Sequence, residues 1–213
     1  MATDPARWIP DAFTLARGEA LQGRIPYAPG SEIAVAGEPT QRPIPPAVEV
    51  FAEWIARWPG VTSAGKRRSP PKPSTAGRRR DLHEEGRAVD AMLADEGSPA
   101  ANATADALAS LLVRNADRLG VQGVIARRAE WYASPYGAAW EAYDGPDPHV
   151  SHVHIELSPE AARWSADEMR QRIAAVVRAP AAPGGASLAP VAIVAVAAVV
   201  AGVIVWRARR RRP

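Results

Sequence analysis

All four histidines of this 213-residue chain fall in two short segments. The second segment, residues 149–157, reads HVSHVHIEL, and within it His152, His154 and Glu156 alternate with aliphatic residues. Successive side chains of a β-strand point to opposite faces. The alternation therefore predicts a strand that carries both histidines on one face of a sheet and buries its aliphatic side chains behind the other.

Two imidazoles on one strand face can bind a metal ion if further ligands come from another segment. The first histidine segment, DLHEEGRAVD over residues 81–90, offers His83 and Asp90. Zn²⁺ accepts neutral histidine nitrogens and carboxylate oxygens, and a catalytic site leaves a position for water. The chain has no cysteine, which excludes disulfides and thiolate ligands. The spacing indicates a mononuclear zinc site, with ordinary hydrogen-bonded histidines as the alternative.

The element His83-x-x-Gly86-x-Ala88-x-Asp90, followed by a late His-x-His strand, resembles the D-alanyl-D-alanine carboxypeptidase/dipeptidase family of zinc metallopeptidases in the hedgehog/DD-peptidase superfamily. The stretches LASLLVRNADRLGVQGVI and YDGPDPHVSHVHIEL resemble a cell-wall-hydrolase-like branch of it. The similarity covers about residues 46–160. It implies a tight turn at Gly86 and a small residue beneath the metal at Ala88.

The resemblance also implies that the zinc ligands are His83, Asp90 and His154. A water molecule, activated by zinc, would then attack a peptide carbonyl group. In such enzymes an arginine before the motif often binds the carboxylate of the substrate, and Arg67 or Arg68 is the candidate here.

Two positions depart from the family pattern. Asp81 stands where serine is usual, and Ser151 replaces the acidic general base three positions before the last zinc ligand. A hydroxyl group cannot act as that base. Penicillin-insensitive murein endopeptidases instead carry histidines five and two positions before the last ligand, and this chain matches them. The resemblance thus makes His152 the first candidate for the catalytic base and His149 the second, while Glu156 is interpreted as a surface carboxylate.

The predicted function is that of a zinc-dependent peptidase, a hydrolase of the D-Ala-D-Ala carboxypeptidase type that cleaves stem or cross-link peptides of peptidoglycan in the cell wall. The alternative is a catalytically weak zinc-binding domain that recognises cell wall or a partner protein. Ser151 is the feature that favours this alternative.

An uncharged apolar run over residues 188–206 precedes an arginine-rich tail over 207–213. An α-helix of that length spans roughly 28 Å, close to the roughly 30 Å hydrocarbon core of a bilayer. The pattern predicts one transmembrane helix, a cytoplasmic tail and an extracytoplasmic soluble domain. The N-terminus shows no recognisable signal peptide, so the route of export stays open.

The net charge of +3 and the pI near 9.7 come from that tail, which holds five arginines. The rest of the chain is slightly acidic, so we expect no nucleic-acid partner. A basic, proline-rich loop over residues 65–80 is interpreted as a solvated excursion. Its alternatives are a binding surface for an anionic polymer, a substrate carboxylate, a nucleic acid or an anionic lipid.

The predicted fold class is α+β, with a small antiparallel sheet of the hedgehog/DD-peptidase type, flanking helices and one C-terminal transmembrane helix. Apolar spacing and capping signals predict helices over 46–58 and 98–119 and strands over 121–126 and 152–157. The predicted organisation is a proline-rich, irregular arm over 1–45, a zinc peptidase-like domain over 46–164, a helix over 165–178, a flexible linker over 179–187, the membrane helix over 188–206 and the tail over 207–213.

Overall fold

The computed structural model describes residues 7–30, 41–67 and 80–178. The chain divides into two compact units, Met1–Ile173 and Ala174–Pro213, and the histidine segments lie in the first unit.

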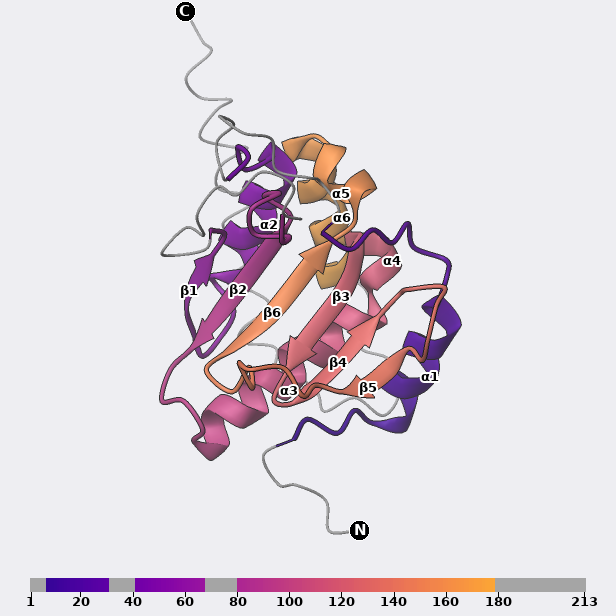
Figure 1. Cartoon of the computed structure of the whole chain (residues 1–213). Helices are drawn as coiled ribbons and strands as arrows, with labels where there is room; N and C mark the ends of the chain where they lie inside the picture. Colours follow the sequence, from indigo (N-terminus) through magenta and orange to yellow (C-terminus); the bar gives the residue numbers. More distant parts are fainter. Residues whose placement is uncertain (1–6, 31–40, 68–79, 179–213) are drawn as a thin grey trace, which may run out of the picture. The chain divides into compact units, whose positions relative to one another are not determined.

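One antiparallel sheet of six strands runs through the first unit in the order β1-β2-β6-β3-β4-β5 (Figure 1). The strands are β1 Val61–Gly65, β2 Ala88–Leu93, β3 Val121–Ala126, β4 Ala129–Tyr132, β5 Trp140–Ala142 and β6 His152–Leu157. Although β6 comes last in the chain, it pairs with both β2 and β3. The histidine-bearing strand therefore lies in the middle of the sheet, next to the strand that carries Asp90.

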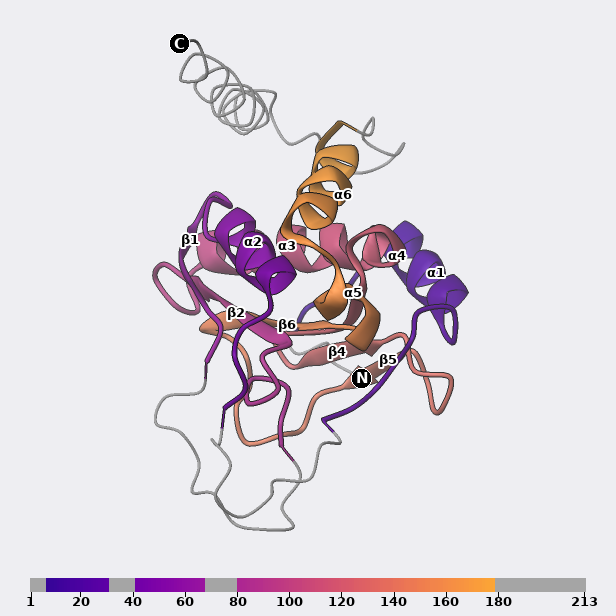
Figure 2. The ribbon, with the colours of Figure 1, turned by 90° about the horizontal axis from the view of Figure 1, so that it is seen from above.

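Figure 2 shows helices α1 to α4 on one side of the sheet. The described helices are α1 Ala12–Leu21, α2 Pro46–Ile55, α3 Pro99–Arg114, α4 Ala116–Leu119, α5 Pro159–Arg163 and α6 Ala166–Arg178. The apolar half of β6, which consists of Val153, Ile155 and Leu157, is fully buried, and α3 packs against this strand through its own buried residues, among them Leu108 and Leu112. Because side chains alternate along β6, its two histidines lie on the opposite face of the sheet.

The pairing of β3 with β6 contains a β-bulge at Gln122. Val121 pairs with Leu157 and Gly123 pairs with Glu156, so two steps along β3 correspond to one step along β6. A bulge inserts an extra residue and redirects its side chain. Gln122 and Gly123, although consecutive, both face the side of the sheet that carries the histidines.

The strands predicted over 121–126 and 152–157 are confirmed, as is the helix start at Ser98, whose Oγ accepts a hydrogen bond from the backbone N–H of Ala101. The helix predicted over 98–119 is interrupted at Asn115, which ends α3 and precedes α4. The arm over 1–45 was expected to be irregular, but it contains α1, whose N-cap Asp11 accepts a hydrogen bond from the N–H of Thr14.

The fold prediction is corrected. It gave the class as α+β, with a small antiparallel sheet, flanking helices and one C-terminal transmembrane helix. The structure is α+β with a six-stranded antiparallel sheet and flanking helices. Among the described residues, no helix has the length and the apolar character that a membrane span requires. The linker over 179–187, the run over 188–206 and the tail over 207–213 lie outside the described residues.

Candidate metal centre

His83 lies in a turn that is closed by two reciprocal hydrogen bonds. The backbone N–H of Glu84 donates to Asp81 Oδ1, and that of Asp81 donates to Glu84 Oε2, both at 3.0 Å. This is the pattern of a capping box, in which Asp81 supplies the capping oxygen that a serine could also supply. Gly86 ends the turn with a φ of +73°, and a Cβ there would lie 2.9 Å from the carbonyl oxygen of Pro43. Glycine is therefore required at this position.

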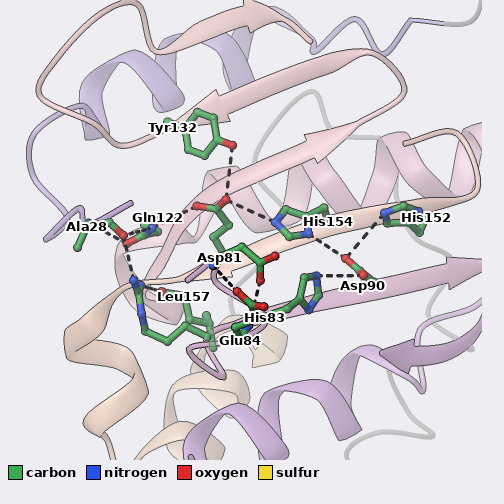
Figure 3. A network of polar contacts seen from close by, with 12 residues as sticks. Ala28, Asp81, His83, Glu84, Asp90, Gln122, Tyr132, His152, His154 and Leu157 are labelled. Atoms are coloured by element: carbon green, nitrogen blue, oxygen red, sulfur yellow. Dashed lines mark hydrogen bonds and ion pairs between the residues drawn. The ribbon is translucent and has the colours of Figure 1, made fainter. Parts of the chain in front are cut away.

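Asp90 lies between two histidines. It pairs directly with His154 across strands β2 and β6, and its Oδ1 accepts a hydrogen bond from His154 Nδ1 at 2.8 Å. Its other oxygen, Oδ2, lies 3.1 Å from His83 Nε2. Figure 3 shows both imidazoles turned toward this carboxylate. The turn and the sheet register thus bring His83 and Asp90, from one segment, together with His154, which is 64 residues from Asp90 in the sequence.

The pKa values of Asp90 and His154 follow from this geometry. Burial alone would raise the pKa of Asp90, but hydrogen bonds from His154 and His83 outweigh it and hold that pKa well below its usual range. Burial alone would lower the pKa of His154, but hydrogen bonds to Asp90 and Glu156 raise it to about 9. In the absence of metal, Asp90 and His154 therefore form a buried ion pair at neutral pH.

The three side chains fit a metal ion. His83, Asp90 and His154 each offer a ligand atom, and these atoms lie within 4.8 Å of one another. Two imidazole nitrogens and a carboxylate oxygen form a donor set that suits Zn²⁺ and leaves room for a fourth ligand. Within the described part of the chain, Nδ1 of His83 is buried without a hydrogen-bond partner, which leaves Nε2 as the atom that faces Asp90.

His152 is the next group outward from the three candidate ligands. Its Nε2 lies 3.8 Å from Asp90 Oδ1, and its Nδ1 lies 3.0 Å from Ser151 Oγ. His149 packs behind it, with ring centroids 4.7 Å apart. Together with Asp147, these two histidines form a second group of three possible ligands.

The backbone of His149 is strained. Its φ is +52°, in the left-handed region that residues other than glycine rarely adopt. The conformation is held by two hydrogen bonds, from its own N–H to Asp147 Oδ1 and from the N–H of Arg127 to its carbonyl oxygen. Burial, followed by the nearby His152 and His154, lowers the pKa of His149 to about 4. The ring is therefore neutral at pH 7.

Glu156 is buried, with 7% of its surface exposed, so its interpretation as a surface carboxylate is wrong. Its Oε1 lies 3.4 Å from His154 Nε2 and accepts a longer contact, at 3.5 Å, from the hydroxyl of Tyr132. Its Oε2 accepts a hydrogen bond from Gln122 Nε2 at 3.2 Å. The carboxylate of Glu156 thus lies beside His154 Nε2, the ring nitrogen that does not face Asp90.

The family model of the VldE C-terminal domain matches residues 40–154, slightly more than half of the 213 residues. The chain belongs to the VldE C-terminal domain family. No curated protein and no solved structure matches the chain. The VldE-family region contains His83, Asp90 and His154, whereas Glu156 lies beyond its end.

The structure brings together five of the predicted site residues, namely His83, Asp90, His149, His152 and His154; their roles stay predictions. Arg67 is exposed, and its Nη1 donates a hydrogen bond to Gln41 Oε1 at 3.2 Å. Arg68 lies outside the described residues. The structure therefore does not bring Arg67 into contact with the three candidate ligands.

The sequence reasoning missed Gln122 and Tyr132 and misjudged Glu156. The period of two along residues 152–157 placed Glu156 on the histidine face, so its position could have been used as a signal. Nothing comparable marked Gln122, because only the bulge turns its side chain toward the same face.

The metal-free protein is expected to lose stability as the pH rises from about 6.5 to about 9. The pKa of His154 is about 9 in the folded chain against a reference of 6.5. Its contribution to the free energy of unfolding is therefore fully present below pH 6.5 and is lost as the pH rises through 9, by about 3 kcal/mol. Urea titrations in the presence of a chelator measure this change. His154→Gln should lack it, and equal wild-type stability at both pH values would contradict it.

Proposed function

We propose that the chain is a zinc-dependent peptidase of the D-alanyl-D-alanine carboxypeptidase type, which cleaves stem or cross-link peptides of peptidoglycan. The observation that carries the proposal is the single carboxylate of Asp90 between His83 and His154, with His152 Nε2 3.8 Å from Asp90 Oδ1. A donor set with a proton-transfer group beside it is what hydrolysis by an activated water requires. The resemblance of the histidine segments to that peptidase family supports the substrate class.

His83, Asp90 and His154 would hold the zinc ion. When bound, zinc supplies Lewis-acid activation of water and of a peptide carbonyl group. Asp90 neutralises charge at the centre and, through its two oxygens, orients the two imidazoles. These residues therefore position the reacting groups rather than move protons.

His152 is the proposed proton carrier. If its Nδ1–H donates to Ser151 Oγ, at 3.0 Å, the other ring nitrogen is a free acceptor. Nε2 then takes a proton from the attacking water and later gives it to the leaving amine. His149, neutral at pH 7 and packed against this ring, keeps the imidazole of His152 in place and is the second candidate for the same role.

Digestion of peptidoglycan and of a synthetic stem pentapeptide tests the proposal. The zinc-loaded chain is expected to release D-alanine or to separate cross-linked stems, with products identified by mass spectrometry. Removal of zinc by a chelator should stop the reaction, and zinc should restore it. Cleavage that persists in the metal-free protein would overturn the proposal, as would a fully zinc-loaded protein that cleaves neither substrate.

A second candidate function is that of a catalytically weak zinc-binding domain that recognises cell wall or a partner protein. It is favoured by Ser151, which puts a hydroxyl group beside His152 where a carboxylate base would be expected. If this candidate is correct, the wild-type chain binds zinc without turnover.

Ser151→Asp separates the two candidates. Because the peptidase proposal gives the proton transfer to His152, we expect the wild type to be active and Ser151→Asp to change kcat by less than about tenfold. Rates on the stem pentapeptide and zinc content are measured in parallel. An inactive wild type that gains activity on substitution, with zinc content unchanged, would favour the second candidate.

A further inference from the structure

Glu156 contacts the metal centre from behind one of its ligands. His154 directs Nδ1 toward Asp90 and Nε2 toward Glu156, at 2.8 and 3.4 Å respectively. A histidine that binds a metal through one ring nitrogen commonly donates the other N–H to a carboxylate, which fixes the tautomer and the ring orientation. The position of Glu156 meets this requirement.

Gln122 holds the carboxylate of Glu156 in place. Its Oε1 accepts a hydrogen bond from the backbone N–H of Ala28 at 3.2 Å, and its Nε2 donates to the carbonyl oxygen of Ala28 at 3.0 Å. Because Oε1 is committed to the Ala28 N–H, the amide NH₂ group must be the part that faces Glu156. The same Nε2 donates to Glu156 Oε2 at 3.2 Å. Figure 3 shows Gln122 beside Ala28, on the side of His154 that faces away from Asp90.

The strands on either side leave space for this arrangement. Glu156 pairs with Ala88 on β2 and with Gly123 on β3, and neither has a large side chain. A Cβ at Gly123 would lie 2.5 Å from the ring of Tyr132 and 3.0 Å from Glu156 Oε2. The glycine therefore admits both the tyrosine ring and the carboxylate, and the bulge next to it supplies the amide.

We propose that Glu156 is a positioning residue of the metal centre: it accepts the Nε2–H of His154 and so presents Nδ1 to the metal ion, while Gln122 and the backbone of Ala28 hold its carboxylate. The inference rests on the metal centre of the proposed function and not on the peptidase activity. Both Glu156 and Ala28 lie outside the VldE-family region.

Zinc affinity tests the proposal on the full chain. Glu156→Gln keeps the shape of the side chain but removes its charge, so we expect zinc binding to weaken about 10- to 100-fold. Competition with a chromophoric chelator measures the dissociation constant. The matched control is Glu160→Gln, the same chemical change at an exposed residue of α5. Its affinity should stay within about twofold of the wild type, because no described interaction joins Glu160 to His154 or Glu156.

A second measurement needs no variant. In zinc-loaded wild-type protein with ¹⁵N-labelled histidine, His154 should carry its proton on Nε2 and none on Nδ1. A proton on Nδ1, or unchanged zinc affinity in Glu156→Gln, would overturn the proposal. A wild type that binds no zinc would overturn it together with the proposed function, whereas zinc binding without peptide cleavage would overturn the proposed function alone.

Discussion

Asp90→Asn is expected to leave the chain without bound zinc and without peptidase activity. The carboxylate of Asp90 is the common partner of His83 Nε2 and His154 Nδ1, so the substitution removes a candidate ligand and the charge that orients both imidazoles. In a zinc peptidase several kcal/mol of transition-state stabilisation depend on the metal, so the proposed function predicts a loss of at least about 1,000-fold in kcat/KM. Metal analysis of the purified protein and the rate on the stem pentapeptide measure the two effects.

The matched control for this variant is Asp117→Asn. Asp117 lies on the surface in α4, where its carboxylate pairs with Arg17 at 2.7 Å. No described interaction joins it to the three candidate ligands. The zinc content and activity of Asp117→Asn should equal those of the wild type. Zinc retained at one ion per chain in Asp90→Asn would contradict the assignment of the centre. A second ion per chain in the wild type that is lost in His149→Ala would assign metal to the group of Asp147, His149 and His152 as well.

His152→Ala is expected to lower kcat about 100- to 10,000-fold while zinc content and KM change little. The reason is that His152 Nε2 lies 3.8 Å from Asp90 Oδ1, beside the candidate metal centre, and is not one of the three candidate ligands. Loss of a positioned general base costs a factor of this size. Steady-state kinetics on the stem pentapeptide, with zinc measured on the same samples, give the comparison.

His149→Ala separates the two candidate bases. Because His149 contacts the site through the ring of His152, its removal should lower kcat less than removal of His152 itself. A larger loss in His149→Ala would reverse the order of the two candidates. Loss of zinc in His152→Ala would instead make His152 a ligand.

The sequence predicts strand β6 well and the remainder of the candidate metal centre only in part. Alternation along residues 152–157 suffices to put His152 and His154 on one face, because strand periodicity is local. The direct pairing of Asp90 with His154 could not be predicted, since no signal marked residues 88–93 as the neighbouring strand. That strand is buried at four of its six positions and does not alternate cleanly.

Contacts that join distant segments escaped prediction for a different reason. Gln122 and Ala28 are separated by 94 residues, and a polar residue in a strand carries no information about which backbone group it will bind. Strands β4 and β5 are four and three residues long, which is too short for a period of two to be recognised. The sheet was therefore predicted to be smaller than it is.

The bulge at Gln122 gives β3 one residue more than the stretch of β6 with which it pairs. A substitution at this position would keep the extra residue and change only the group that meets Glu156. Deletion of the same residue would leave Val121 opposite Leu157 and Gly123 opposite Glu156, so that β3 would pair evenly with β6 and only the amide beside Glu156 would be lost. We therefore expect the extra residue to serve the site rather than the sheet.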